Sequence, residues 1–350
     1  MKSVFTRSLI LIALSAILCP VAVMTVQFYL AWVALVPLFI ATLEAKPRKA
    51  FMPGMGFGLV FCAIMLYWMV GLVSDFAGSG GYGIAFYLIA LILSGIYFGS
   101  LLTGISWLAA NDRPAWLKGL LAASLWTVGE WIYSSLLPGM PWFGLFRVSN
   151  MVLDNLYAIQ IASLSGAFII SFFIVWINYM LAAYVAKRQW KMVAVPLGAL
   201  LAYMTAGFGM YEANRPSKTT QHLGVALLCD NTPPNVKWDE HSGNELVTNL
   251  LKLNNDALAT NPDIVLWSEA VVPWTYRNDD DFLAEIRKMA GTAPVTHILG
   301  MTTDYSAESI YNSAYVLLPG GGITGRYDKR YPVSMAERPM AFISLPAPAR

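Results

Sequence analysis

Residues 264–273 read IVLWSEAVVP and place one carboxylate directly after an apolar run. The run over residues 264–267 is typical of a short buried strand. Glu269 follows two residues later, where the strand gives way to a loop. A rigid strand end keeps a carboxylate still, which is what a general base requires. We therefore expect Glu269 to be the centre of a functional site.

The sequence around this stretch has two halves of different composition. The 350 residues are 57% hydrophobic and only 13% charged, which is unlike a typical soluble domain. Long apolar runs fill residues 1–211, whereas residues 221–350 have the charge density of a soluble domain. The polar segment 212–220 is expected to be a linker. We predict a multi-spanning α-helical membrane bundle followed by a soluble domain.

The first half contains apolar runs of the length that crosses a bilayer, about 20 residues. We expect seven membrane spans, and Pro20 leaves open that the first two form one broken helix. The expected spans lie near residues 8–23, 25–43, 52–73, 83–109, 117–137, 160–186 and 192–210.

Basic residues alternate between the loops of this half, which predicts its orientation. They precede the first expected span and follow the second, fourth and sixth, while the other loops carry almost none apart from Arg147. The positive-inside rule then places the N-terminus in the cytoplasm. After seven spans the soluble domain lies outside, which for a bacterial inner membrane is the periplasm.

Two features of the membrane half suggest more than anchoring. Glu130 lies within an apolar run, and a carboxylate at membrane depth is costly and often functional. An interfacial glutamate paired with a neighbouring helix is the alternative. Trp142 lies in the rigid aromatic loop 138–143, PGMPWF. This loop suits either a plain aromatic belt at the headgroup level or a role in admitting lipid.

In the second half, apolar strands and amphipathic helices alternate, which predicts an α/β layered domain covered on both faces of its sheet. Strands are expected over 222–230, 264–267, 295–301, 311–318 and 323–327, and helices over 244–259 and 280–290. Glycines 320–322 are expected to form a hairpin turn between the last two strands.

Several classes of partner are not indicated. A net charge of +2 gives no basic field of the kind that binds nucleic acid. Cys19, Cys62 and Cys229 have no paired spacing, so we expect no metal site and no disulfide framework. No cofactor is expected.

Short motifs in one order along the chain carry a resemblance. They are Glu130-Trp131, Gly139-Met140-Pro141-Trp142, Lys237-Trp238-Asp239, Trp267-Ser268-Glu269-Ala270 with Pro273, Tyr311-Asn312-Ser313, and Tyr327-Asp328-Lys329 with Glu337. With these motifs the chain resembles the apolipoprotein N-acyltransferase family of bacterial inner-membrane enzymes. The resemblance implies that residues 221–350 are part of a periplasmic nitrilase-like αββα sandwich. A conjugal-transfer relative of the TraB kind shares this architecture and stays open.

The resemblance also implies roles for individual residues. Glu269 corresponds to the general base, Lys329 to the cation that stabilises the oxyanion, and Glu337 to a supporting carboxylate. Trp238 corresponds to a substrate-facing residue, and Trp142 and Glu130 are further candidates for substrate contact. The implied partners are the bilayer, a phospholipid acyl donor and a lipoprotein acceptor.

One part of the family pattern is missing. The family's nucleophilic cysteine follows the lysine and the second glutamate, but no cysteine follows Cys229 here. Cys229 precedes Glu269, so it is not expected to substitute. We expect a C-terminally truncated and catalytically inactive chain. A non-catalytic relative that binds lipid or lipoprotein and a transporter-like membrane protein are the alternatives.

Overall fold

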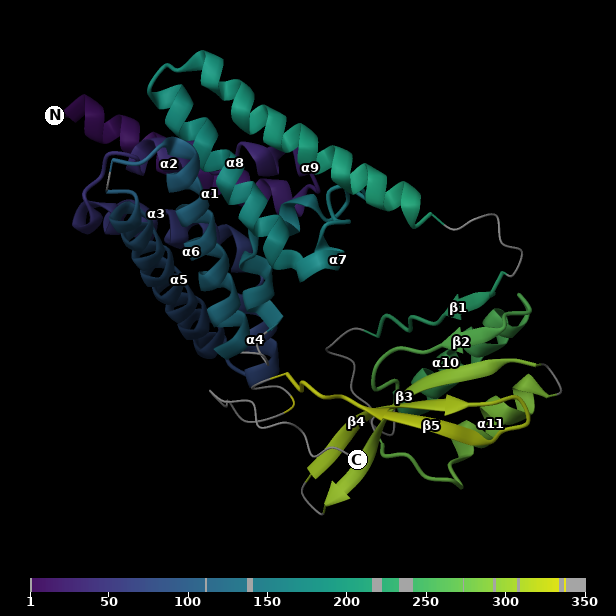
Figure 1. Ribbon diagram of the computed structural model, residues 1–350. Coiled ribbons are helices and arrows are strands. Elements are labelled where there is room, and N and C mark those ends of the chain that lie inside the picture. The colour runs from purple at the N-terminus through teal and green to yellow at the C-terminus, as the bar shows by residue number, and fades with distance from the viewer. Residues whose placement is uncertain are drawn as a thin grey trace. The chain divides into compact units, whose positions relative to one another are not determined.

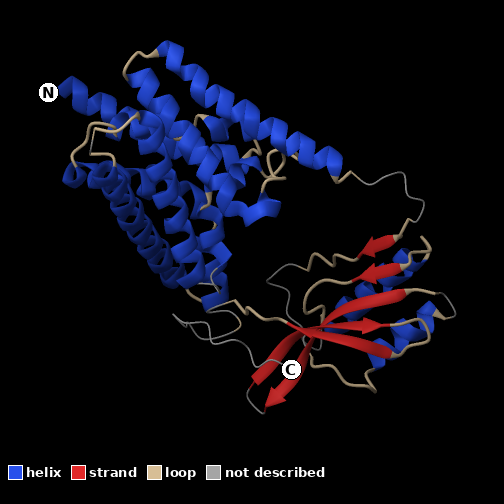
Figure 2. Ribbon diagram, viewed as in Figure 1, coloured by secondary structure: helices blue, strands red, loops and turns tan. Residues whose placement is uncertain are grey.

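The computed structural model describes residues 2–110, 112–136, 141–215, 222–232, 242–272, 274–291, 294–306, 309–333 and 337. The chain divides near residue 216 into a helical unit and an α/β unit, whose helices and strands are labelled in Figure 1. Figure 2 shows the sheet in the second unit. The expected helical bundle followed by a partial α/β domain is thus confirmed.

The helical unit is a multi-pass membrane bundle. Among the described residues, five helices are long and apolar enough to cross a bilayer: Thr6–Met24, Pro47–Leu66, Gly80–Leu108, Ala167–Ala186 and Trp190–Ala213. The α-helices are α1 (Lys2–Met24), α2 (Val36–Thr42), α3 (Pro47–Leu66), α4 (Met69–Ala77), α5 (Gly80–Leu108), α6 (Ala115–Leu136), α7 (Ala162–Ser165), α8 (Ala167–Ala186) and α9 (Ala194–Ala213). The 3-10 helices are η1 (Phe28–Trp32), η2 (Pro141–Phe146), η3 (Val148–Val152) and η4 (Trp190–Val193).

The segment expected as one span over 25–43 is divided into η1 and the seven-residue α2. Buried polar side chains stabilise this break. Asn178 of α8 donates to the Ala31 carbonyl at 2.8 Å and accepts from the Leu35 amide at 3.0 Å. The Ser15 hydroxyl accepts from the Leu38 amide at 2.8 Å. Backbone groups freed by the break are therefore satisfied inside the bundle, as the bilayer requires.

Helices α3 and α5 pack with their backbones in close contact because glycines line both. A Cβ atom on Gly58 would lie 2.5 Å from the Ser94 carbonyl oxygen, and one on Gly99 would lie 2.9 Å from the Phe51 ring. The Ser94 hydroxyl donates to the Gly58 carbonyl at 3.1 Å. Small residues of this kind are a common means of helix association in membranes.

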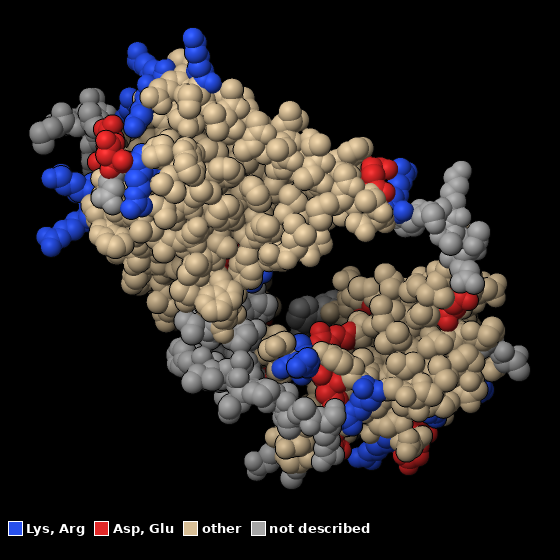
Figure 3. Space-filling model, viewed as in Figure 1, with Lys and Arg blue, Asp and Glu red and all other residues tan. Residues whose placement is uncertain are grey.

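Basic side chains of the helical unit are concentrated toward one end of the face seen in Figure 3. The Ser106 hydroxyl near the end of α5 donates to the Ala45 carbonyl before α3. The basic loop before α3 and the loop after α5 therefore lie at the same end of the bundle. This is the arrangement that the alternating loop charges predict.

The α/β unit has a five-stranded sheet in the order β1-β2-β3-β4-β5. Strands β1, β2 and β3 are parallel, and β4 and β5 continue antiparallel. Its elements are β1 (Val225–Leu227), α10 (Gly243–Leu258), β2 (Ile264–Leu266), α11 (Asp281–Ala290), β3 (Thr296–Ser306), β4 (Ser309–Leu317) and β5 (Ile323–Asp328). Strand β3 extends five residues past its expected end at 301, because it pairs with β4 as far as Ser306 and Ser309.

Helices α10 and α11 cover one face of this sheet. Leu250, Leu283 and Ile286 pack in one buried cluster with Val265 and Leu299 of the strands. Burial alternates along β3 and β4, so one face of the sheet forms the core. The opposite face carries exposed apolar side chains, with Leu227 73% exposed. The strands are apolar on both faces, as expected. Helices α10 and α11, however, both pack on the same face of the sheet.

Candidate active site

Glu269 lies on a tight turn that packs directly against the backbone of Gly300. Trp267 donates to the Ile298 carbonyl at 3.0 Å and Val271 to the Gly300 carbonyl at 2.9 Å, so residues 268–270 cross over Gly300 between these two bonds. A Cβ atom on Gly300 would lie 2.6 Å from the Ser268 carbonyl oxygen and 2.9 Å from the Glu269 Cα. Any side chain at position 300 would displace the turn.

Lys329 joins the two predicted carboxylates. It follows β5, and its amide donates to the Asn312 carbonyl at 2.8 Å. Its Nζ lies 2.7 Å from Glu269 Oε1 and 2.9 Å from Glu337 Oε2. The structure thus brings together three residues that are 60 and 8 positions apart in the sequence.

Asn312 is a fourth member, which the sequence did not single out as a site residue. Its Nδ2 donates to Glu269 Oε1 at 2.6 Å and to Glu337 Oε1 at 2.8 Å. The motif Tyr311-Asn312-Ser313 was the only signal for it. Its place depends on the β3–β4 register, which pairs Asn312 with Thr302. We call Glu269, Lys329, Glu337 and Asn312 the acid–lysine cluster.

The cluster holds one ammonium group between two carboxylates. Desolvation lowers the pKa of Lys329, but hydrogen bonds and charges from Glu269 and Glu337 outweigh it and raise the pKa above its ordinary value. Desolvation raises the pKa of Glu337, but hydrogen bonds from Val333, Asn312 and Lys329 outweigh it and lower the pKa. Lys329 is therefore a fixed cationic donor. The Glu269 side chain is 62% exposed and accessible to a reactant.

Comparison with known proteins relates this chain to apolipoprotein N-acyltransferases. Residues 15–180 match the family model described as the Apolipoprotein N-acyltransferase N-terminal domain. The chain is 28% identical over 324 residues to the apolipoprotein N-acyltransferase of Geobacter metallireducens, covering 89% of this chain and 61% of the relative. The corresponding Nostoc protein is 24% identical over 327 residues (89% and 63%), and the Borreliella burgdorferi protein 25% identical over 354 residues (95% and 65%). The chain is thus similar to apolipoprotein N-acyltransferases over most of its length.

The match to the apolipoprotein N-acyltransferase family extends beyond the helical unit. The family model ends at residue 180, within α8, whereas the alignments with relatives cover 89% and 95% of the chain. They therefore continue into the α/β unit that carries the acid–lysine cluster. The chain spans about three-fifths of the length of these relatives.

Three other site residues were expected from the resemblance to apolipoprotein N-acyltransferases. Trp238 lies outside the described residues. Trp142 belongs to η2 of the helical unit, where its side chain is not described. Glu130 of α6 is only 1% exposed. Its Oε1 accepts from Trp126 Nε1 and from the Val148 amide, both at 3.1 Å, and so ties α6 to η3.

Two of the three cysteines lie in the helical unit and one lies in the α/β unit. Cys19 and Cys62 are buried in the helical unit, whereas Cys229 is exposed just after β1. Among the described residues, no group of three or more His, Cys, Asp and Glu side chains is arranged to hold a metal ion.

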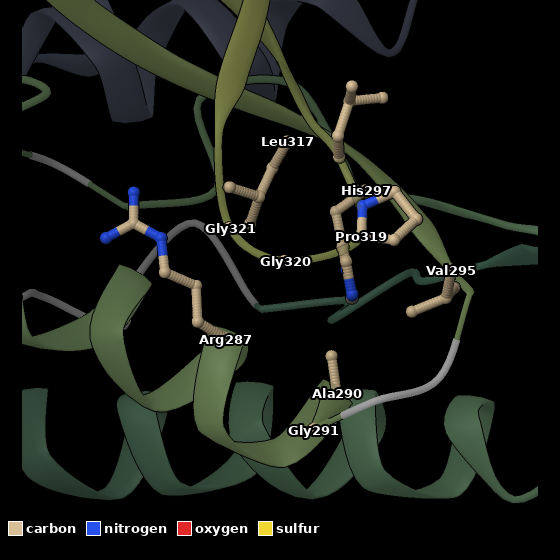
Figure 4. A pocket seen from close by; sticks show the side chains of 10 residues that line it. Arg287, Ala290, Gly291, Val295, His297, Leu317, Pro319, Gly320 and Gly321 are labelled. Atoms are coloured by element: carbon tan, nitrogen blue, oxygen red, sulfur yellow. The ribbon is translucent and has the colours of Figure 1, made fainter.

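A small pocket of about 100 Å³ lies near the β4–β5 turn (Figure 4). Its lining includes Arg287 and Gly291 of the α11 end and Pro319 of the turn. His297 also lines it and is 1% exposed, and its Nδ1 accepts from Trp267 Nε1 at 3.2 Å. His297 pairs with Leu317 near the turn, whereas Asn312 lies toward the other end of β4. We therefore assign this pocket no part in the chemistry of the cluster.

Proposed function

We propose that this chain serves the transfer of a fatty acyl chain from a phospholipid to the N-terminal diacylglyceryl-cysteine of bacterial lipoproteins. The contact of Lys329 with Glu269 at 2.7 Å and Glu337 at 2.9 Å is the observation that carries this proposal. It unites a base, a cation and a supporting acid, which is what acyl transfer through a thiol requires.

Each member of the cluster has one task in this scheme. A thiol near its ordinary pKa of about 8.5 is mostly protonated at neutral pH, so Glu269 takes its proton as the sulfur attacks the phospholipid ester carbonyl. Lys329 donates to the oxyanion that forms. The tetrahedral intermediate expels the lysophospholipid alkoxide, which receives the proton from Glu269. Glu337 and Asn312 hold Lys329 and Glu269 in place.

The second half of the reaction reverses these movements. The lipoprotein α-amine attacks the acyl thioester carbonyl, and Lys329 again donates to the oxyanion. The C–S bond breaks, the amine loses a proton to Glu269, and the thiolate regains it. The products are the N-acylated lipoprotein and the free thiol, so atoms and charge balance.

The polypeptide of residues 1–350 contains no cysteine after Cys229. We therefore expect this polypeptide, purified in detergent, to form no acyl thioester with a labelled phospholipid. The assay looks for an acyl adduct that hydroxylamine removes, and detects it by gel and mass spectrometry. A labile adduct that Cys229→Ser abolishes would overturn this expectation and identify Cys229 as the nucleophile.

The roles of Glu269 and Lys329 are tested in a chimera. We would extend residues 1–350 with the remaining C-terminal part of the Geobacter metallireducens relative, to which the chain aligns over 324 residues. Glu269→Gln is expected to lower acyl transfer by roughly 10²–10⁴-fold, the usual worth of a general base. Glu285→Gln is the matched control, because Glu285 pairs only with the exposed Lys288 among the described residues. Equal activity of Glu269→Gln and parent chimeras contradicts the proposal.

We further propose that the bundle lies in the bacterial inner membrane with the α/β unit in the periplasm. The alternating loop charges support this orientation. Cys229 is a natural reporter because it is exposed while Cys19 and Cys62 are buried. A membrane-impermeant maleimide applied to spheroplasts should label the wild type and not Cys229→Ser. Labelling that requires permeabilised cells would place the unit in the cytoplasm.

A further inference from the structure

We propose that Asp230 is a positioning residue that fixes the turn carrying Glu269. Ser268 directly precedes Glu269 in the chain. Its hydroxyl donates to Asp230 Oδ1 at 3.0 Å. The Thr232 hydroxyl donates to the other carboxylate oxygen, Oδ2, at 2.5 Å. The inference rests on the role of general base proposed above for Glu269.

The turn is attached to β3 by backbone hydrogen bonds at its two ends, and its side chains supply its further attachments. Residues 268–270 lie between the ladder bonds of Trp267 and Val271, and Ala270 has a φ of +47°, a conformation that a residue with a Cβ rarely adopts. The Glu269 side chain is 62% exposed, so apolar packing does not fix it. Among the described residues, the Ser268–Asp230 bond ties the backbone of this turn to the neighbouring strand end.

Asp230 is itself well fixed. The Leu228 amide donates to the Leu266 carbonyl at 2.9 Å, so the segment after β1 runs beside the segment after β2. Asp230 and Ser268 are each two residues further on, which places them opposite one another. The hydrogen bond from Thr232 lowers the pKa of Asp230, and together with the bonds from Ser268 and from backbone groups it outweighs the opposing effect of burial. The carboxylate therefore remains an acceptor at neutral pH.

Loss of the hydrogen bond between Ser268 and Asp230 should change the reactivity of the Lys329 amine. When the turn loosens, Glu269 leaves Lys329 for part of the time, and the ammonium group loses one of its two carboxylate partners. Its amine is then more often free to react with an acylating reagent. Lysine reactivity therefore reports the position of Glu269 without requiring catalysis.

The experiment is competitive acetylation of the whole chain in detergent at pH 9, with each lysine quantified by mass spectrometry. Lys288 is the internal reference, since it is exposed and its partner Glu285 lies outside the cluster. Asp230→Ala and Ser268→Ala should each raise acetylation of Lys329 relative to Lys288 by about fivefold, the factor that one hydrogen bond is worth. Asp230→Asn keeps an oxygen acceptor for Ser268 and should stay near wild type.

Glu269→Gln separates this proposal from the proposed function. If Glu269→Gln raises Lys329 acetylation but Ser268→Ala and Asp230→Ala do not, Asp230 has no positioning role and the acid–lysine cluster stands. If Glu269→Gln itself has no effect, the cluster on which the proposed function depends is wrong. Where Asp230→Ala fails to fold, judged by its melting temperature, Ser268→Ala decides, because it removes the same bond and leaves Asp230 with Thr232.

Discussion

Gly300→Ala adds only one methyl group but should disturb the position of Glu269. The added Cβ would lie 2.6 Å from the Ser268 carbonyl oxygen and 2.7 Å from the Ala270 amide nitrogen, both of them backbone atoms. Ordinary contact begins near 3.4 Å, so the turn must move by 3.4 − 2.6, or about 0.8 Å. A shift of this size separates Glu269 Oε1 from Lys329 Nζ, which lie 2.7 Å apart in the native structure. Overpacking of this kind costs about 1–3 kcal/mol of stability.

Gly325→Ala is the matched control for this substitution. Gly325 lies in β5 of the same sheet, and its Cβ would meet the Val316 side chain at 3.5 Å, an ordinary contact. The assays are the melting temperature of the α/β unit within the full chain and the acetylation of Lys329 relative to Lys288. Gly300→Ala should lower the first and raise the second, and Gly325→Ala should change neither. Equal behaviour of the two variants would refute the argument that the turn rests on Gly300.

Two further predictions concern other parts of the chain. Gly58→Leu should reduce the thermal stability of the detergent-solubilised bundle, because its Cβ would lie 2.5 Å from the Ser94 carbonyl oxygen. Gly71→Leu is the control and should not reduce it, because a Cβ at position 71 has no neighbour within 4 Å. Size-exclusion chromatography after heating measures both variants. Burial lowers the pKa of His297 from 6.5 to about 4. The unfolded chain therefore binds a proton in this range that the folded chain does not, so the free energy of unfolding should fall as the pH drops from 6.5 toward 4, and this dependence should weaken in His297→Gln.

Much of the fold followed from local patterns in the sequence. The apolar run over 264–267 and the amphipathic stretches at 244–259 and 280–290 correspond to β2, α10 and α11. Asp280 caps α11 by accepting from the Leu283 amide at 3.1 Å, as expected for an acid before a helix. Where the expectation and the structure differ, a distant residue is the cause. Asn178 of α8 stabilises the break before α2, and no pattern within residues 25–43 contains it.

Some residues of the candidate site were likewise predictable from local sequence, and others were not. The strand end before Glu269 and the ordered motifs around Lys329 and Glu337 were sufficient to name three members of the cluster. Their mutual contacts, and the inclusion of Asn312, depend on β4 lying beside β3 in one register. The residues that hold the Glu269 turn could not be predicted either. Gly300 lies on β3, 31 positions from Glu269, and Asp230 lies after β1, 39 positions from it.

The sequence by itself thus determined the division into a membrane half and an α/β half, the order of the elements and the chemistry available to the site. Hydrophobic periodicity and residue type encode these properties locally. Only the tertiary structure decided that one lysine lies between two carboxylates, that Asn312 bridges them and that a glycine and an aspartate hold the turn. These contacts join strands to the segments that follow them, and their alignment depends on the register of the whole sheet.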